Sequence, residues 1–131
     1  MRHVPGSIAW VLLASLICAG CASHSSKETD HPSPGRDAEL AIEIENHNWS
    51  DVVIYLLRGG APERIGMVTA HSTNTFVLRY RRLGASGNNR LSAYPIGGGS
   101  AVNTDNLLVQ PGQSIKWTLE SDLSRSSLVV Y

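Results

Sequence analysis

Cysteine is scarce in this 131-residue chain, and both of its cysteines, Cys18 and Cys21, lie near the start. A folded domain in the remainder of the chain therefore has no disulfide and depends on core packing. A zinc or redox role for a C-x-x-C pair requires a folded frame around it and, for zinc, two further ligands. Neither is visible in the surrounding sequence, "LLASLICAGCASHSS".

The chain also lacks an apolar run long enough to cross a membrane. Residues 8–19 are apolar except for Ser15, whereas a spanning helix needs roughly 20 such residues. A positive start, "MRH", precedes this short run, and small residues end it. This order is typical of a secretion signal.

An excess of charge of either sign is missing as well. Lys and Arg number 11 and Asp and Glu number 11, so the basic face of a nucleic-acid-binding protein is not indicated. There is no G-x-S-x-G motif, and "GGGS" at 97–100 lacks the Gly-Lys-Ser/Thr ending of a phosphate-binding loop. We therefore expect a protein that is not an enzyme and that has no cofactor and no metal site.

The start of the chain does contain Ala19-Gly20-Cys21, which resembles the lipobox of bacterial lipoproteins. Cys18 stands where that family usually has Leu or another aliphatic residue. The resemblance implies a signal peptide over residues 1–20 and a lipid on the Cys21 thiol that attaches the protein to a membrane. It also implies transport to the outer membrane of a Gram-negative host, because Ala and Ser follow the cysteine where Asp would favour retention.

The composition changes after the cysteine. Residues 22–37, "ASHSSKETDHPSPGRD", contain no aliphatic residue larger than Ala. Such a segment cannot bury enough apolar surface to offset the entropy of ordering it, so residues 21–37 are predicted to be a lipidated, flexible tether. Residues 38–131 are long enough for one small domain and too short for two.

Signals for short strands dominate this domain. "LAIEIE" alternates between apolar and polar residues, which is the period of a strand with one buried face. "VVIYLL" is a continuous apolar run, which predicts a strand covered on both sides. Further strands are expected at "RIGMVT", "TFVLRY", "RLSAYPI", "LLVQ", "SIKWTLE" and "SLVVY", with turn-forming segments such as "RGGAPE" between them. The pattern predicts an all-β fold, a single antiparallel β-sandwich of about eight strands and immunoglobulin-like type, with a small open β-barrel as the alternative.

The alternation also predicts the core. The inward residues are expected to be Leu40, Ile42, Ile44, Ile54, Ile65, Met67, Phe76, Leu78, Leu91, Ile115, Trp117 and Leu119.

Four arginines lie close together in the sequence at Arg79, Arg81, Arg82 and Arg90. Three glutamates occupy the outward positions of the first strand, at Glu39, Glu43 and Glu45. We interpret the arginines as part of a solvated sheet face, or as charges that guard a sheet edge, and expect them to pair with these glutamates across neighbouring strands. A patch for phosphate or a lipid headgroup is the alternative.

Candidate binding residues come from the loops. If successive strands alternate in direction, segments 46–51, 70–73, 97–106 and 121–126 meet at the end of the domain far from the tether. This end would collect His47, Asn48, Trp49, His71, Asn103 and Asp105. Binding residues are often carried by loops on a rigid scaffold, and an exposed tryptophan suits a contact with a protein or a glycan. Alternatively, Trp49 folds back and caps the core.

Together these patterns predict a lipid-anchored cell-envelope protein whose β-sandwich binds or scaffolds another envelope component, a protein or a glycan. The alternatives are a receptor for a small ligand or glycan, and a hydrolase of unrecognised type that uses His47 or His71. No nucleic-acid partner is expected.

Overall fold

A computed structural model of the chain describes residues 35–84 and 87–131. The predicted signal peptide, Cys21 and most of the predicted tether lie outside the described residues. The described part has eight strands, β1 (Glu39–Asn46), β2 (Val52–Arg58), β3 (Ala61–Val68), β4 (Ser72–Arg79), β5 (Asn89–Pro95), β6 (Val102–Asn103), β7 (Ile115–Leu119) and β8 (Ser127–Val130). It also has two short 3-10 helices, η1 (Tyr80–Leu83) and η2 (Leu123–Arg125). No helix in these residues has the length and apolarity needed to cross a membrane.

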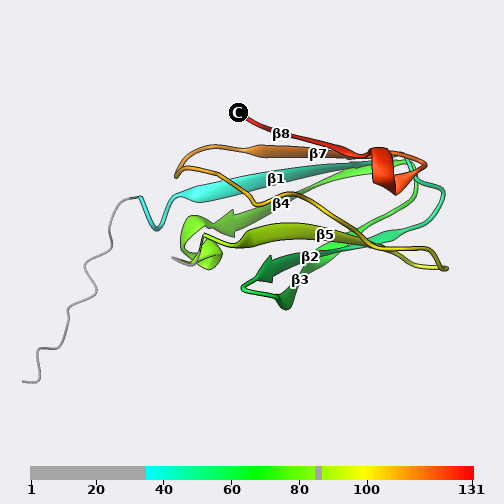
Figure 1. Ribbon diagram of the computed structural model, residues 1–131. Coiled ribbons are helices and arrows are strands. Elements are labelled where there is room, and N and C mark those ends of the chain that lie inside the picture. Colours follow the sequence, from blue (N-terminus) through cyan, green and yellow to red (C-terminus); the bar gives the residue numbers. More distant parts are fainter. Residues whose placement is uncertain (1–34, 85–86) are drawn as a thin grey trace, which may run out of the picture. The chain divides into compact units, whose positions relative to one another are not determined.

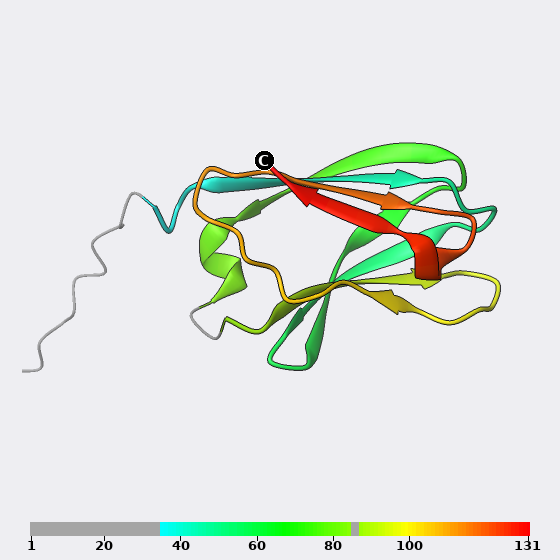
Figure 2. The same ribbon diagram turned by 45° about the horizontal axis from the view of Figure 1, so that its top comes forward.

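The strands form two four-stranded sheets that lie face to face (Figures 1 and 2). We call the sheet with the order β4-β1-β7-β8 sheet A, and the sheet with the order β3-β2-β5-β6 sheet B. The predicted all-β sandwich is thus confirmed, and the two sheets of the described residues do not close into a barrel. Each sheet buries one face of its strands against the other sheet, which places the core between them.

One pair of strands departs from the predicted antiparallel arrangement. β1 pairs with β7 in parallel, from Ile42 opposite Ile115 to Asn46 opposite Leu119. The other five strand pairs are antiparallel. Successive strands do alternate in direction, as expected, so two odd-numbered strands that become neighbours in one sheet have to run the same way.

Two strands begin at places that the sequence did not indicate. The turn predicted over "RGGAPE" is confined to Gly59 and Gly60, whose φ angles are 55° and 93°. Arg58 and Ala61 already pair with each other, as in a two-residue hairpin with positive φ at both central positions. The sixth strand is Val102–Asn103 and not "LLVQ".

The predicted core is largely correct. Buried side chains include Leu40, Ile42, Ile44, Ile54, Leu78, Leu91, Ile115, Trp117 and Leu119, while Ile65 and Phe76 are partly buried against them. Met67 is the error, with 41% of its surface exposed. Tyr55 lies opposite Arg64 and Ile54 opposite Gly66, so Ile65 is an extra residue in a β-bulge. Alternation restarts after the bulge, and Met67 faces outward.

The core contains apolar residues that the sequence did not single out. These are Val52, Leu56, Val68, Leu83, Ala93, Leu107, Val109 and Leu123. Leu107 and Val109 belong to the expected sixth strand and are buried without forming one. The amide of Leu107 donates to the carbonyl of Asn89 at 2.7 Å, so this segment lies beside β5 as extended chain.

The outer face of β2 is not covered by another layer, contrary to the prediction from its continuous apolar sequence. Val52, Ile54 and Leu56 are fully buried, whereas the alternate residues are only partly buried. The outer side of sheet B is therefore a solvent-facing surface with apolar side chains.

The predicted pairing of the arginine cluster with Glu39, Glu43 and Glu45 is wrong in its partners. Arg79 and Arg81 lie 3.7 and 3.3 Å from Asp37, and Arg82 pairs with Glu63. Glu43 and Glu45 instead lie 3.1 and 3.0 Å from Lys116. The parallel β1–β7 pairing causes this, because it places Lys116 directly beside Glu43.

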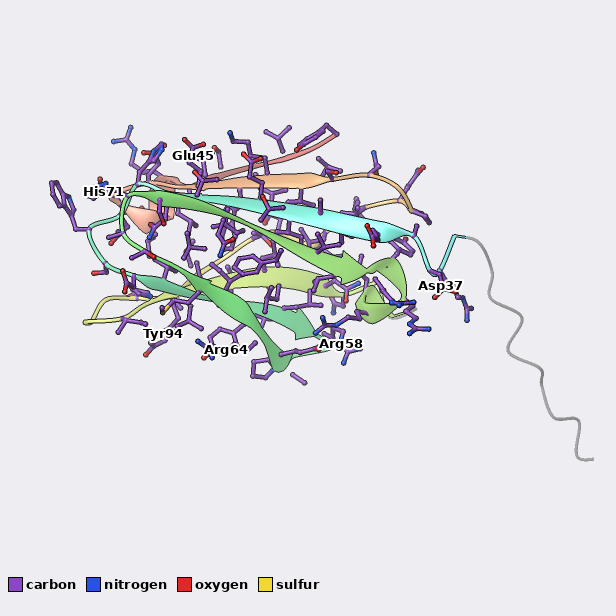
Figure 3. All side chains as sticks on the ribbon, turned by 180° about the vertical axis from the view of Figure 1, so that it is seen from behind. Asp37, Glu45, Arg58, Arg64, His71 and Tyr94 are labelled. Carbon is purple, nitrogen blue, oxygen red and sulfur yellow. The ribbon has the colours of Figure 1, made fainter. Side chains whose placement is uncertain are left out.

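The sandwich has two distinct ends. At the proximal end β1 begins, beside the end of β4, with Glu39 opposite Arg79. At the loop end β1 leads into β2, β3 into β4, β5 into β6 and β7 into β8. In Figure 3, Asp37 and Arg58 lie toward the proximal end and Glu45 and His71 toward the loop end.

Candidate binding surface at the loop end

Four connections meet at the loop end, formed by residues 47–51, 69–71, 96–101 and 120–126. Strand pairing brings them together, because Asn46 lies opposite both Ser72 and Leu119, and Val52 lies opposite both Val68 and Pro95. The predicted gathering of these loops is confirmed.

Two of the predicted site residues lie elsewhere. Asn103 belongs to β6, the edge strand of sheet B, and pairs with Ser92, halfway along β5. The amide of Thr104 donates to Leu91, so Asp105 lies still farther from the loop end. The physical reason is that the chain rejoins sheet B at Val102, which makes the connection much shorter than the predicted segment 97–106.

A buried asparagine organises the loops. Asn46 is fully buried, and its Nδ2 donates to the carbonyls of Ser50 and Thr69, both at 3.0 Å. Its Oδ1 accepts from the amide of Asn48 at 3.0 Å. Asn46 therefore joins the β1–β2 loop to the β3–β4 loop. Its position was detectable, because the inward alternation of β1 continues to this polar residue.

Asn48 extends this network to the β7–β8 loop. Its Nδ2 donates to the carbonyl of Ser121 at 2.8 Å, and its Oδ1 accepts from the amide of Ser50 at 2.9 Å. The Ser121 hydroxyl donates to the carbonyl of His47 at 3.2 Å. Both ends of the Asn48 amide are thus engaged within the protein, and we assign this residue to positioning the loop.

Trp49 lies on the outside of this ordered loop, with 80% of its surface exposed. The alternative in which it caps the core is wrong. Its ring meets the ring of His71 edge to face, with the centroids 4.6 Å apart and the planes at 86°. His71 is the one non-glycine residue in the described part with a positive φ, 51°, a conformation in which histidine is enriched among non-glycine residues.

A hollow of about 380 Å³ lies beside this loop. Asn48 forms part of its lining, together with the glycine-rich 98–101 segment and residues 121–124. The lining consists mostly of small residues and presents polar and apolar groups in equal measure. The loop end therefore combines an exposed tryptophan with a neighbouring depression of mixed polarity.

The loop end is acidic, and His47 lies between two of its carboxylates. His47 Nε2 is 3.0 Å from Glu45, and Nδ1 is 3.6 Å from Glu120. The hydrogen bond to Glu45 raises the pKa of His47 above its ordinary value, and Lys116 and His47 together lower the pKa of Glu45. Both groups that contact the His47 ring are carboxylates, so His47 forms ion pairs with them at the surface when it is protonated.

Acid–base groups do not cluster further. Among residues 35–84 and 87–131, no three or more His, Cys, Asp or Glu side chains are grouped so that they could hold a metal ion. The function has to be inferred from this geometry, because no protein-family model and no curated protein matches the chain.

Proposed function

We propose that this protein is a lipid-anchored cell-envelope protein that binds another envelope component through the loop end of its β-sandwich, without acting as an enzyme. The observation that carries the proposal is Trp49, whose large apolar ring is exposed on an ordered loop. Tryptophan is among the residues that contribute most to protein interfaces when they become buried.

The surroundings of Trp49 support binding, because the loop is already ordered. Asn46 and Asn48 hold this loop through hydrogen bonds to two other segments, the β3–β4 and β7–β8 loops, and through a bond from the Ser50 amide to Asn48 Oδ1 within the loop. The ring of His71 contacts the Trp49 ring edge to face. A partner would then lose little conformational entropy from this loop on binding, which favours affinity.

The proposed anchor at Cys21 precedes the end of the domain that lies opposite the Trp49 loop. The chain from Cys21 enters at the start of β1, at the proximal end, whereas the Trp49 loop lies at the other end of the same strand. Even a fully extended segment between Cys21 and β1 spans at most roughly 60 Å. A lipid on Cys21 would hold the sandwich near the membrane with the loop end accessible. We propose the outer membrane as the location.

Site-specific photo-cross-linking in cells tests the binding surface. A benzoylphenylalanine at position 49 should give a discrete adduct with one envelope component. The matched control is position 131, where Tyr131 is also an exposed aromatic residue, at 64%, but lies away from the loop end. The proposal fails if position 49 gives no adduct, or if both positions give the same adducts.

The variant Trp49→Ala separates binding from folding. Removing the edge-to-face contact should lower the free energy of unfolding by at most about 1.5 kcal/mol, so the melting temperature should change little while the adduct partner is no longer captured. A melting temperature lowered by many degrees would instead make Trp49 a structural residue.

Membrane fractionation of Cys21→Ala tests the anchor. The wild-type chain should be found with the membrane and the variant should not. If the variant stays membrane-bound, lipidation at Cys21 is not what attaches the protein.

A second candidate is a receptor for a small ligand or glycan, which the hollow beside Asn48 favours, because its lining offers both hydroxyl groups and apolar contacts. A ligand in this hollow would change the surroundings of Trp49. Saturable quenching of tryptophan fluorescence by an envelope glycan, abolished in Trp49→Phe, would support this candidate over a protein partner.

A further inference from the structure

Positive charge gathers at the proximal end. The arginines there are Arg36, Arg58, Arg79, Arg81, Arg82 and Arg90, and the acidic residues are Asp37, Glu39, Glu63 and Asp105. The loop end has the opposite balance, with Glu45, Asp51, Glu120 and Asp122 against Arg125. The described domain therefore has a basic end where the chain from Cys21 enters and an acidic end away from it.

A cavity of about 500 Å³ opens at this basic end. It lies between η1 and residues 107–109, and its lining includes the apolar side chains of Leu83 and Leu107 together with Arg36 and Arg81. The hydroxyl of Tyr80 donates to the carbonyl of Val109 at 2.9 Å. This bond joins the two walls of the cavity.

Asn89, which also lines the cavity, has a buried acceptor without a partner. The residue is 4% exposed, and in the described part of the chain its Oδ1 is buried and receives no hydrogen bond. Buried polar atoms are normally paired. This oxygen has almost no accessible surface, so a ligand hydroxyl in the cavity would donate to it only after the Asn89 side chain turns toward the cavity.

Leu108 lies at the same cavity with 82% of its surface exposed. A soluble inorganic anion has no apolar group that would contact this side chain. An amphiphile would use all the groups present, with an anionic group for Arg36 and Arg81, a hydrogen-bond donor for Asn89 and an apolar part for Leu108.

From this combination we infer that the proximal cavity binds the headgroup of an anionic phospholipid in the membrane that holds the anchor. The phosphate pairs with Arg36 and Arg81, and Leu108 contacts the apolar region beneath the headgroup. A headgroup hydroxyl donates to Asn89 Oδ1 once that side chain has turned toward the cavity. Anionic membrane surfaces attract basic groups within a Debye length. The inference rests on the proposed anchoring at Cys21 for the nearness of the membrane, whereas the site itself does not depend on it.

A titration with water-soluble lipids tests the site without using the anchor. The full chain is held in a neutral detergent, with its leucine methyl groups labelled for NMR. Dihexanoylphosphatidylglycerol should shift the resonances of Leu83, Leu107 and Leu108 saturably, and dihexanoylphosphatidylcholine should not. Inorganic phosphate should leave these methyl groups unshifted, because it contains no apolar part.

Variants assign the response to the cavity. The double variant Arg36→Ala/Arg81→Ala should weaken the lipid affinity at least tenfold, while Arg125→Ala, at the loop end, should leave it unchanged. Asn89→Leu should weaken binding without lowering the melting temperature, because it removes an unpaired acceptor. Since Asn89→Leu alters a buried position, the arginine variants provide the decisive comparison.

The inference is overturned if no leucine responds to either lipid, if both lipids act equally, or if Arg125→Ala weakens binding as much as the double variant. Shifts produced by phosphate alone would replace the lipid with a free anion as the ligand and also overturn it. A chain that binds the anionic lipid but does not fractionate with membranes would overturn the anchor and leave the site standing.

Discussion

The outer faces of the two sheets, which both face solvent, differ in composition. On sheet A, Glu43 and Glu45 share Lys116, and Glu45 also reaches His47, so the outward charges neutralise one another. On sheet B the outward residues are largely apolar or aromatic. They include Val53, Tyr55, Leu57, Met67 and Tyr94.

The charged residues that the strands of sheet B carry outward are arginines. Arg64 lies opposite Tyr55 and Arg90 opposite Leu57, and neither forms an ion pair within the described residues. The one acidic residue of β3, Glu63, pairs with Arg58 and Arg82. The comparison shows that an outward position on a strand does not predict a polar residue in this domain. A side chain is buried when it faces the other sheet, whatever the polarity of the residues on the outer face.

Adjacent residues of β2 give the largest expected contrast between a buried and an outward position. Ile54→Ala should lower the free energy of unfolding by about 2–5 kcal/mol, because it leaves a cavity between the sheets. Val53→Ala, on the partly exposed face, should cost less than about 1.5 kcal/mol. Chemical denaturation of both variants measures the difference. Equal losses would mean that the outer face is packed as tightly as the core.

Gly66 tests how closely β3 and β4 approach each other. A Cβ at this position would overlap the ring of Phe76, so Gly66→Ala forces the ring or the strand to move. Overpacking of this kind typically costs about 1–3 kcal/mol. Gly98→Ala is a control for the loss of a glycine, since nothing lies near its Cβ position, although its positive φ adds some strain. A neutral Gly66→Ala would show that Phe76 can reorient freely.

The ion pairs of sheet A should matter less and should depend on salt. Lys116→Met removes the shared cation of Glu43 and Glu45 and leaves two like charges on neighbouring positions of β1. We expect a small drop in melting temperature that disappears at high ionic strength, because exposed charges are screened. Arg64→Met, which breaks no ion pair on sheet B, should show no such salt dependence. The comparison of the two faces would be undermined if both variants behaved alike.

The smallest expected effect is the change in thermal stability with pH that His47 causes. The pKa of His47 is raised above its ordinary value of 6.5, first of all by its hydrogen bond to Glu45. Its contribution to stability is therefore fully present below pH 6.5 and is lost as the pH rises through the folded-state pKa. Thermal unfolding should show a slight decline above this range, and His47→Gln should abolish it.

At acidic pH, Glu63 gives the opposite dependence of stability on pH. Hydrogen bonding to Arg82 lowers the pKa of Glu63 below 4.5, so its contribution is present above pH 4.5 and is lost as the pH falls through the folded-state pKa. The combined expectation is a maximum of stability between pH 4.5 and 6.5. A melting temperature that rises steadily above pH 6.5 in the wild type, with no change in His47→Gln, would contradict this assignment.

Several elements of this structure could be predicted from local sequence. β1 and β7 were identified from alternation alone, and Trp117 was correctly placed in the core. Met67 could not be placed in this way, because a bulge at Ile65 changes which face each later residue occupies. The brief β6 was also hidden, since two residues carry no periodic pattern.

The residues of the candidate site also fall into those that local sequence predicted correctly and those that it did not. His47, Asn48, Trp49 and His71 were found because loops at one end of alternating strands must meet. Asn103 and Asp105 were misplaced, because the length of a connection within a glycine-rich stretch cannot be inferred from its composition. Asn89 and the proximal cavity were not anticipated, because they depend on how residues 104–110 lie against β5.

By itself, the sequence determined an eight-stranded domain, most of its core and the resemblance of residues 19–21 to a lipobox, since these depend on periodicity and short motifs. Only the tertiary structure decided that β1 and β7 run in parallel, that Asn46 joins separate loops and that the arginines gather at the proximal end. These features join residues far apart in the chain. Local patterns cannot specify them, because the energy of such contacts exists only once both sheets have formed.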